Sequence, residues 1–280
     1  MAGSPALARQ LQVAVEAARS AGAVIAAAFH RPKRVEHKGP ADLVTDTDRR
    51  CEALVLDAIR ASFPDHQFIG EEASADAAAH LTDAPTWMVD PLDGTTNFVH
   101  GYPFVAVSIA LVVNRAAVVG VVYNPVLEEM FTATAGGGAF LNGEPIRPSD
   151  TSDPGSALLG TELGVQKDDA TLGAVFGRVR DLSKITRSLR CGGSCAIGLC
   201  NVACGRLDAF YEIGFGGCWD VAAGALIVQE AGGVVVDPAG GPYDVMARRV
   251  LAGNGHLTGA LSAVIRDGVL GPKEPAAPGS

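Results

Sequence analysis

Two aspartates three residues apart end an apolar run, in the stretch Trp87-Met88-Val89-Asp90-Pro91-Leu92-Asp93-Gly94-Thr95-Thr96-Asn97-Phe98. Pro91 favours an extended Asp90, and the Leu92 carbonyl is free to face a cation. Hard oxygen ligands on a stiff turn suit Mg²⁺ rather than zinc or copper. The backbone N–H groups after Asp93 could open a helix at which a phosphate binds. An Asx turn would explain one aspartate, but not two with hydroxyls after them and a buried strand before them.

Three further acidic segments could supply oxygen ligands. Glu71 belongs to Gly70-Glu71-Glu72, which follows an apolar pair, although two adjacent glutamates are usually a solvated turn. Asp220 opens an apolar helix and is expected to be its N-cap, which leaves its second oxygen available to a metal. Asp48 is the last of three acids near the start of another expected helix. These acids could complement the helix dipole, or they could position a water or a third cation.

Composition restricts the class of protein. The chain has 280 residues, of which 48% are hydrophobic and 19% charged, and its formal net charge is −9. These values indicate a globular protein rather than a disordered one. They disfavour generic binding to nucleic acid, which a basic chain would do better. An acidic chain can still bind a phosphate ester if divalent cations reverse the local charge.

The cysteines and the N-terminal segment bear on the compartment. None of the six cysteines forms a CxxC pair or a zinc-finger spacing with histidine. We therefore favour small buried side chains in a reducing cytosol over a metal or redox site. Residues 5–29 are apolar but interrupted by charges, which indicates an amphipathic helix and not a membrane span or a signal peptide. We expect a cytoplasmic protein, with a plastid transit peptide as the alternative.

The pattern of elements predicts layers of helix and sheet. Alternating apolar runs between residues 104 and 141 indicate an antiparallel meander, and strands alternate with helices after Pro148. We expect one domain over residues 1–270, made of two fused lobes (about 1–150 and 151–270), with a flexible tail at 271–280. The expected helices span residues 5–29, 46–62, 168–182, 194–204, 220–231 and 256–265. The expected strands span residues 67–70, 86–89, 104–113, 117–123, 130–134, 139–141, 157–161, 186–190, 207–211, 234–236 and 250–252.

Three motifs, in their order and spacing, resemble the inositol monophosphatase family. They are the segment DPLDGTTNF at residues 90–98, Gly70-Glu71-Glu72 before it, and Trp219-Asp220-Val221-Ala222-Ala223-Gly224 after it. The resemblance runs from about residue 8 to about residue 260. Two other segments, at residues 35–39 and 212–217, resemble the plant-type members, which act on inositol monophosphates and on L-galactose 1-phosphate.

The resemblance implies a layered α/β fold of α+β type, an αβαβα five-layer sandwich. It also implies a homodimer, two to three Mg²⁺ ions and inhibition by Li⁺. By position, the implied metal ligands are Glu71, Asp90, the Leu92 carbonyl, Asp93 and Asp220. Thr95 and Asp48 correspond to the pair that activates the attacking water, with Glu71 beside them. The implied substrate-binding residues are Asp93, Gly94, Thr95, Gly193, Ser194, Cys195, Ala196, Glu212, Asp220 and Lys38, which lies near the entrance.

One departure concerns the alcohol pocket. Animal members often carry a histidine shortly before the Cys-Trp-Asp segment, whereas this chain has Gly216-Gly217. The sequence therefore predicts a Mg²⁺-dependent phosphomonoesterase that releases inositol and phosphate by in-line attack of a metal-activated water. Three alternative substrates are histidinol phosphate, fructose 1,6-bisphosphate and 3′-phosphoadenosine phosphate. A different class of protein, a regulatory binder with a residual site, is the remaining alternative.

Overall fold

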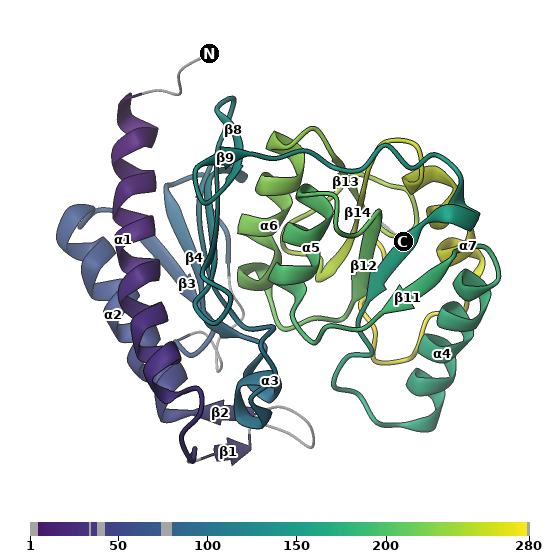
Figure 1. Ribbon diagram of the computed structural model, residues 1–280, viewed down its shortest axis with the longest axis horizontal. Helices are drawn as coiled ribbons and strands as arrows, with labels where there is room; N and C mark the ends of the chain where they lie inside the picture. The colour runs from purple at the N-terminus through teal and green to yellow at the C-terminus, as the bar shows by residue number, and fades with distance from the viewer. Residues whose placement is uncertain (1–4, 34, 38–42, 74–79, 279–280) are drawn as a thin grey trace.

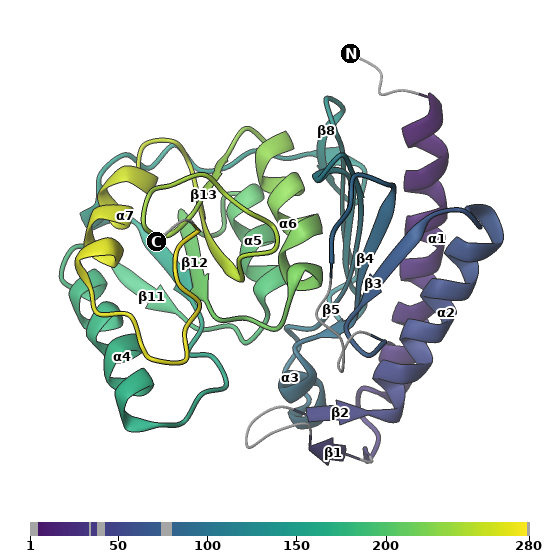
Figure 2. The same cartoon turned by 180° about the vertical axis from the view of Figure 1, so that it is seen from behind.

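Five layers of helix and sheet make up the structure (Figure 1). It is a computed structural model that describes residues 5–33, 35–37, 43–73 and 80–278. One outer layer holds α1 (Pro5–Ala28) and α2 (Asp46–Ser62), and the middle layer holds α5 (Cys195–Ala203) and α6 (Cys218–Glu230). The reverse view shows α4 (Asp169–Ser183) and α7 (Thr258–Asp267) on the opposite outer face (Figure 2). The two sheets lie between these helical layers, so the predicted αβαβα sandwich is confirmed.

The first sheet has seven strands in the order β3-β4-β5-β6-β7-β8-β9. All neighbours are antiparallel except β3 and β4, which run parallel. The predicted meander is therefore confirmed, and the strand predicted at residues 86–89 continues to Asp93. The strands are β3 (Gln67–Gly70), β4 (Thr86–Asp93), β5 (Ala106–Val113), β6 (Ala116–Asn124), β7 (Glu129–Thr134), β8 (Gly138–Leu141) and β9 (Glu144–Pro145).

The second sheet has five strands in the order β11-β10-β12-β14-β13. The strand β10 runs parallel to both neighbours, whereas β14 is antiparallel to both of its own. Its strands are β10 (Leu158–Thr161), β11 (Ser188–Arg190), β12 (Ala209–Ile213), β13 (Val234–Val236) and β14 (Arg249–Gly253). Three short elements complete the fold near the site and the linker: the pair β1 (Val35–His37) and β2 (Leu43–Thr45), the helix α3 (Thr95–His100), and a 3₁₀ turn at Pro154–Ser156.

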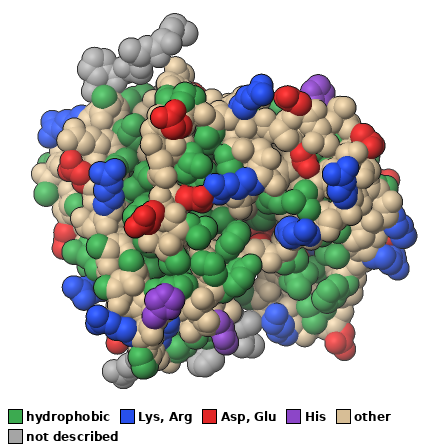
Figure 3. Space-filling model, viewed as in Figure 1, with side chains coloured by type: hydrophobic (Ala, Val, Ile, Leu, Met, Phe, Trp, Pro, Cys, Tyr) green, Lys and Arg blue, Asp and Glu red, His purple; other side chains and the backbone are tan. Residues whose placement is uncertain are grey.

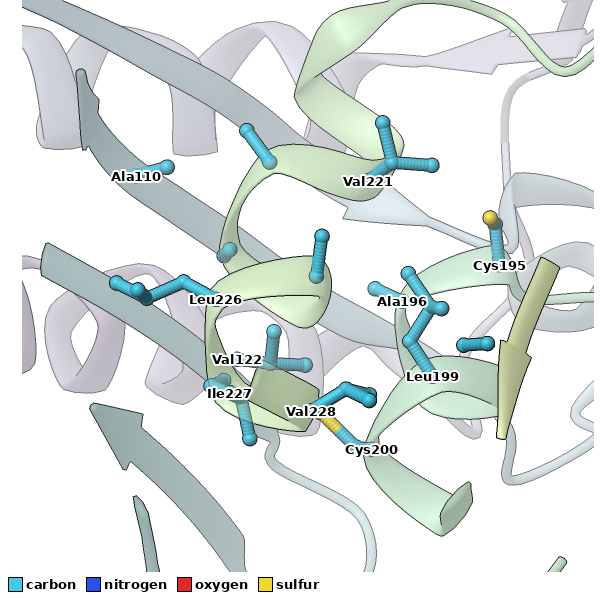
Figure 4. Close-up of a cluster of buried hydrophobic side chains, with 14 of the residues drawn as sticks. Ala110, Val122, Cys195, Ala196, Leu199, Cys200, Val221, Leu226, Ile227 and Val228 are labelled. Atoms are coloured by element: carbon cyan, nitrogen blue, oxygen red, sulfur yellow. The ribbon is translucent and has the colours of Figure 1, made fainter. Parts of the chain in front are cut away.

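The helix α6 packs against both the first sheet and its neighbour α5. Figure 4 shows Ala110 of the first sheet on one side of α6 and Leu199 of α5 on the other, and Val122 of the first sheet belongs to the same buried cluster. Small residues permit this close packing, because a Cβ at Gly120 of β6 would lie 2.8 Å from the Ala223 carbonyl oxygen. The buried cluster around α6 includes residues of both sheets. The two lobes therefore share one core.

The helix α1 is long and apolar enough, by length and composition, to cross a membrane. In the fold it packs against α2 and the first sheet. Ala14, Ala17, Ala18, Ala21 and Ile25 are fully buried there at helical spacing. The amphipathic helix expected at residues 5–29 is confirmed.

The segment after α7 contacts the second lobe through two buried arginines. Arg178 donates to the Val269 carbonyl at 2.6 Å and pairs with Glu274, and both side chains are almost fully buried. Arg249, which pairs with Asp237, donates to the Pro275 carbonyl at 2.9 Å. The sequence predicted a flexible tail from residue 271, and composition alone could not reveal these anchors. Gly271 is buried, and Glu274 and Pro275 are held by the two arginines, whereas Pro272 and Lys273 are exposed.

We predict that Glu274→Ala lowers the free energy of unfolding by roughly 3–5 kcal/mol, because it leaves the buried Arg178 guanidinium without its counter-charge. Urea denaturation measures the change, and Glu144→Ala on the exposed strand β9 is the control. The double variant Arg178→Met/Glu274→Leu should recover much of the loss. An unchanged unfolding midpoint for Glu274→Ala would contradict the anchoring role.

Candidate active site

A β-bulge brings Asp90 and Asp93 to the same side of the first sheet. Residues three apart on a regular strand point to opposite faces. Here Asp90 pairs with Ser108 and Asp93 with Ala106, so three steps along β4 oppose two along β5. The extra residue restores a common direction. Both carboxylates are at most 9% exposed, and Oδ1 of Asp90 accepts from the Leu92 N–H at 2.9 Å.

Two other carboxylates reach the same place from distant segments. Glu71 follows β3, the parallel neighbour of β4, so both strands end at one edge. Asp220 lies in the first turn of α6, whose start is fixed to β5 because Ser108 Oγ donates to the Trp219 carbonyl at 2.9 Å. The sequence predicted Asp220 as the N-cap, which is wrong. The helix begins two residues earlier, Gly217 is the cap, and the Asp220 carboxylate accepts from the Gly217 N–H at 3.4 Å.

Three of the four carboxylates are buried, Glu71 is half-buried, and all four crowd one another. Burial is the largest cause that raises the pKa of Asp90 well above its ordinary value, and repulsion from Glu71, Asp93 and Asp220 adds to it. Burial likewise raises the pKa of Asp220, with Asp93 and Glu71 as further causes. Burial raises the pKa of Asp93 to about 6, although Ser194 and several backbone N–H groups oppose the rise. A cation bound among them would relieve this repulsion.

Thr95 and Asp48 contact each other beside these carboxylates. Thr95 Oγ1 lies 3.1 Å from Oδ1 of Asp48 and 3.2 Å from the Leu92 carbonyl oxygen. Asp48 is fully buried and belongs to the capping box of α2, in which its other oxygen accepts from the Thr45 N–H at 2.9 Å. Burial raises the pKa of Asp48 despite these hydrogen bonds. The chain thus brings together, from 47 positions apart, the pair predicted to handle the water.

Position 94 requires a glycine. It has φ +89°, a left-handed conformation, and a Cβ there would lie 2.7 Å from the Phe104 carbonyl oxygen. This backbone caps the start of α3. It is what turns the chain directly after Asp93, so that the N–H groups of the DGTT segment can open α3 at the cavity.

The loop before α5 meets the first lobe at Asp93. Ser194 Oγ donates to Oδ2 of Asp93 at 2.6 Å, and the Ala196 N–H donates to the same oxygen at 2.7 Å. Ser194 also caps α5. Of the predicted substrate residues, Gly193, Ser194 and Cys195 line the cavity beside Asp93.

Two residues of the site were missed by sequence reasoning. The Asn97 amide donates to the carbonyls of Phe104 and Gly192, each at 2.8 Å, and so joins the two lobes. Oε1 of Glu162 accepts from the Gly192 N–H at 2.9 Å. Asn97 stands in the motif itself, and Glu162 directly follows a predicted strand. An acid or amide at a strand or helix end was the only available signal, and it is a weak one.

A cavity of ≈ 690 Å³ is lined by these residues and by Glu212. Glu212 is 6% exposed, and no hydrogen-bond donor reaches its Oε2 within the described chain. Burial, followed by repulsion from Glu162 and Asp220, raises its pKa well above the ordinary value. Lys167 and Arg248 also contribute to the lining. The predicted entrance residue Lys38 lies outside the described residues.

Comparison with known proteins identifies the family. The model of the inositol monophosphatase family matches residues 7–269. The chain belongs to the inositol monophosphatase family. Inositol monophosphatase 2 of Solanum lycopersicum is 57% identical over 253 residues, 90% of this chain and 96% of the relative.

Solved structures agree with the family in fold. The extragenic suppressor protein suhB of Bartonella henselae superposes with a TM-score of 0.84 at 34% identity, covering 93% of this chain and all of that one. An inositol monophosphatase from Anabaena gives 0.82 at 36% identity, covering 94% and 97%. The chain is therefore an enzyme, a phosphatase of the inositol monophosphatase family.

Inositol monophosphatases are generally metal-dependent, and the donor set here fits a hard cation. Its candidates are three buried carboxylates, the half-buried Glu71 and one carbonyl, all oxygen ligands of the kind that Mg²⁺ takes. Over the part of the chain that the structure describes, no three acidic, histidine or cysteine side chains already form a metal-binding group. Instead Asp220 shares a hydrogen bond with Asp90, and Asp93 is bound by Ser194. A cation bound between Asp90 and Asp220 would replace the hydrogen bond that joins them.

We predict that Asp220→Asn stabilises the protein in EDTA by roughly 1–3 kcal/mol at pH 8, because it removes a crowded buried charge while keeping an acceptor for the Gly217 N–H. The folded-state pKa of Asp220 lies above its unfolded value. The fold therefore prefers the protonated acid, and wild-type stability falls as pH rises through that range.

The difference between Asp220→Asn and wild type should accordingly be small in acid and grow toward pH 8. Thermal unfolding in EDTA at a series of pH values measures it. A variant less stable than wild type at pH 8 would show that the carboxylates are not under mutual strain.

Proposed function

We propose that this inositol monophosphatase is a Mg²⁺-dependent phosphomonoesterase that hydrolyses inositol monophosphates, and also L-galactose 1-phosphate. The observation that carries the proposal is the convergence of Glu71, Asp90, Asp93 and Asp220 on one cavity, beside the Thr95–Asp48 pair. The names of the curated relatives support inositol phosphate as the substrate. The plant-type segments at residues 35–39 and 212–217 motivate the galactose ester.

The proposed ligands of two to three Mg²⁺ ions are Glu71, Asp90, the Leu92 carbonyl, Asp93 and Asp220. When bound, the ions would neutralise the phosphate dianion and acidify the attacking water. We propose that Li⁺ inhibits by competing for these oxygens.

The chain's own residues would handle the proton of the attacking water. The Thr95 hydroxyl donates to the buried Asp48 carboxylate, so its lone pairs are directed away from Asp48 and toward the cavity that it lines. A water that donates to Thr95 could pass its proton along this hydrogen bond to Asp48. The raised pKa of Asp48, caused by burial, makes it a better acceptor of that proton. Glu71 at the same edge would orient the water.

Phosphate and alcohol would occupy opposite ends of the cavity. The backbone N–H groups of Gly94 and Thr95 would receive the phosphate. The unpartnered Oε2 of Glu212 would accept a hydrogen bond from a hydroxyl of the alcohol. A buried acceptor without a donor costs free energy, and the substrate would remove that cost. The lining segment Gly193–Cys195 and the adjoining Ala196 would position the ring, and Lys38 would act at the entrance.

The alternative substrates differ in the charge that they bring. A bisphosphate needs cations for its second phosphate, and the described lining offers Lys167 and Arg248. Arg248 already donates to the carbonyls of Phe215 and Gly214. This favours a monophosphate over fructose 1,6-bisphosphate or 3′-phosphoadenosine phosphate, and histidinol phosphate remains the monophosphate alternative. The complete set of acidic residues favours an enzyme over a regulatory binder.

We further propose a homodimer that acts on small molecules, without nucleic acid or membrane as a partner. The homodimer follows from the family resemblance. The net charge of −9 argues against a nucleic-acid partner, as does the face in Figure 3, where Lys and Arg are interspersed with Asp and Glu. We propose a cytoplasmic location, with the plastid as alternative, because all six cysteines are free. Light scattering of the purified protein tests the dimer, and a C-terminal fluorescent fusion tests the compartment.

We predict that Asp93→Asn lowers kcat on myo-inositol 1-phosphate by roughly 10²–10³-fold or more while the protein stays folded, because the carboxylate that faces the phosphate is lost. Phosphate release measures kcat, circular dichroism checks the fold, and Glu144→Gln is the control for a lost surface charge. EDTA should abolish wild-type turnover and Mg²⁺ restore it. Full activity of Asp93→Asn, or turnover insensitive to EDTA, would refute the proposal.

We predict that Glu212→Gln lowers kcat/KM for myo-inositol 1-phosphate by roughly 10–100-fold, the worth of one charge-assisted hydrogen bond. The same variant should hydrolyse p-nitrophenyl phosphate, which has no ring hydroxyl, nearly as well as wild type. L-galactose 1-phosphate and histidinol phosphate complete the panel. Equal losses on all four esters would mean that Glu212 does not read the alcohol.

A further inference from the structure

The segment from Gly192 to Ala196 runs between two carboxylates of different lobes. The N–H groups of Gly192, Gly193 and Ser194 donate to Glu162, which follows β10 of the second sheet. The next two N–H groups, those of Cys195 and Ala196, donate to Asp93 of the first sheet. Five successive backbone N–H groups thus face two acids, the first three Glu162 and the last two Asp93.

The carbonyls of the same segment are also held. Asn97 donates to Gly192 at 2.8 Å and lies 3.2 Å from the Gly193 carbonyl oxygen. Gly193 has φ +78°, and a Cβ there would come within 2.8 Å of the Asn97 amide. The segment is therefore fixed on both its donor and its acceptor side, in a conformation that glycine alone adopts easily.

The proposed function requires Asp93 in a defined orientation, and this inference rests on that function. Oδ2 of Asp93 is held by Ser194 Oγ and by the Ala196 N–H. Both donors belong to the segment whose first half is bound by Glu162. We propose that Glu162 is a positioning residue, which sets the Gly192–Ser194 backbone so that Ser194 and the start of α5 hold Asp93 for the reaction.

The charge of Glu162 is costly, which argues against a role in packing alone. Glu162 lies largely buried near Asp93, and burial raises its pKa to about 7. It also lies near Glu212, whose pKa it raises in turn. A glutamine would fill the same space without repulsion, but it offers one acceptor oxygen where a carboxylate offers two. A carboxylate can therefore distribute the three N–H groups that face it over two oxygens, which a glutamine cannot do.

Hydrogen exchange followed by mass spectrometry tests the proposal without any substrate. The peptide that covers residues 191–197 should exchange at least 10-fold faster in Glu162→Gln than in wild type. Glu162→Asp keeps the charge but shortens the reach, so it should behave like Glu162→Gln. Glu144→Gln, an equal charge change on an exposed strand, should leave that peptide unchanged.

Kinetics supply the functional half of the test. Glu162→Gln and Glu162→Asp should lower kcat on myo-inositol 1-phosphate by roughly 10–100-fold, as expected for a misplaced catalytic group, with a smaller change in KM. Glu162→Gln should unfold at the same temperature as wild type or higher, which separates misplacement from unfolding.

Unchanged exchange at residues 191–197, or wild-type kcat in both variants, would overturn the positioning role. Wild-type activity in Glu162→Asp alone would also overturn it, since charge and not reach would then matter. Failure of the proposed function looks different, because the wild-type protein would then hydrolyse no inositol phosphate while the exchange difference persisted.

Discussion

The folded chain holds like charges together in a place where water cannot screen them well. Asp90, Asp93 and Asp220 are each at most 9% exposed. Asp93 and Asp220 both raise the pKa of Asp90, and Asp93 raises the pKa of Asp220. Buried, crowded anions oppose folding, so the surrounding structure must supply the stability that they remove. The bulge in β4, the donors of the α5 segment and the Gly217 N–H all act on these carboxylates directly. The rest of the fold serves to keep those three supports in register.

The helix α6 provides that register because it touches the first sheet, α5 and the second sheet at once. Its close approach to β6 at Gly120 fixes its depth, and the Ser108–Trp219 hydrogen bond fixes its start. Asp220, in the first turn, then has one available place, beside the ends of β3 and β4. The site therefore depends on packing across the middle layer, and neither lobe contains it alone.

The sequence predicts most of the fold, since hydrophobic periodicity and turn residues act locally. The meander, the helix at residues 46–62 and the long first helix follow from such signals. Of the site, only the Asp90–Thr95 half is local, and the convergence of Glu71 and Asp220 came from the family resemblance. The bulge at residues 90–93 was not predicted, because it depends on pairing with β5. Asn97, Glu162 and the docked tail were missed for the same reason, since each acts on a distant segment. Asn97 and Glu162 bind Gly192 from 95 and 30 positions away, and Arg178 binds Val269 from 91 positions away.

The two glycines before Cys218 connect substrate choice to the metal end of the site. A Cβ at Gly217 would lie 2.5 Å from the Trp219 ring, and one at Gly216 would lie 3.1 Å from Oδ2 of Asp220. Gly216 also lines the cavity, together with Gly214 and Phe215. A side chain introduced to reshape the alcohol pocket at these positions would therefore press on Trp219, whose carbonyl accepts from Ser108, or on Asp220 itself. Glu212 lies on a separate element, β12, so changes in alcohol specificity can occur there without displacing Asp220.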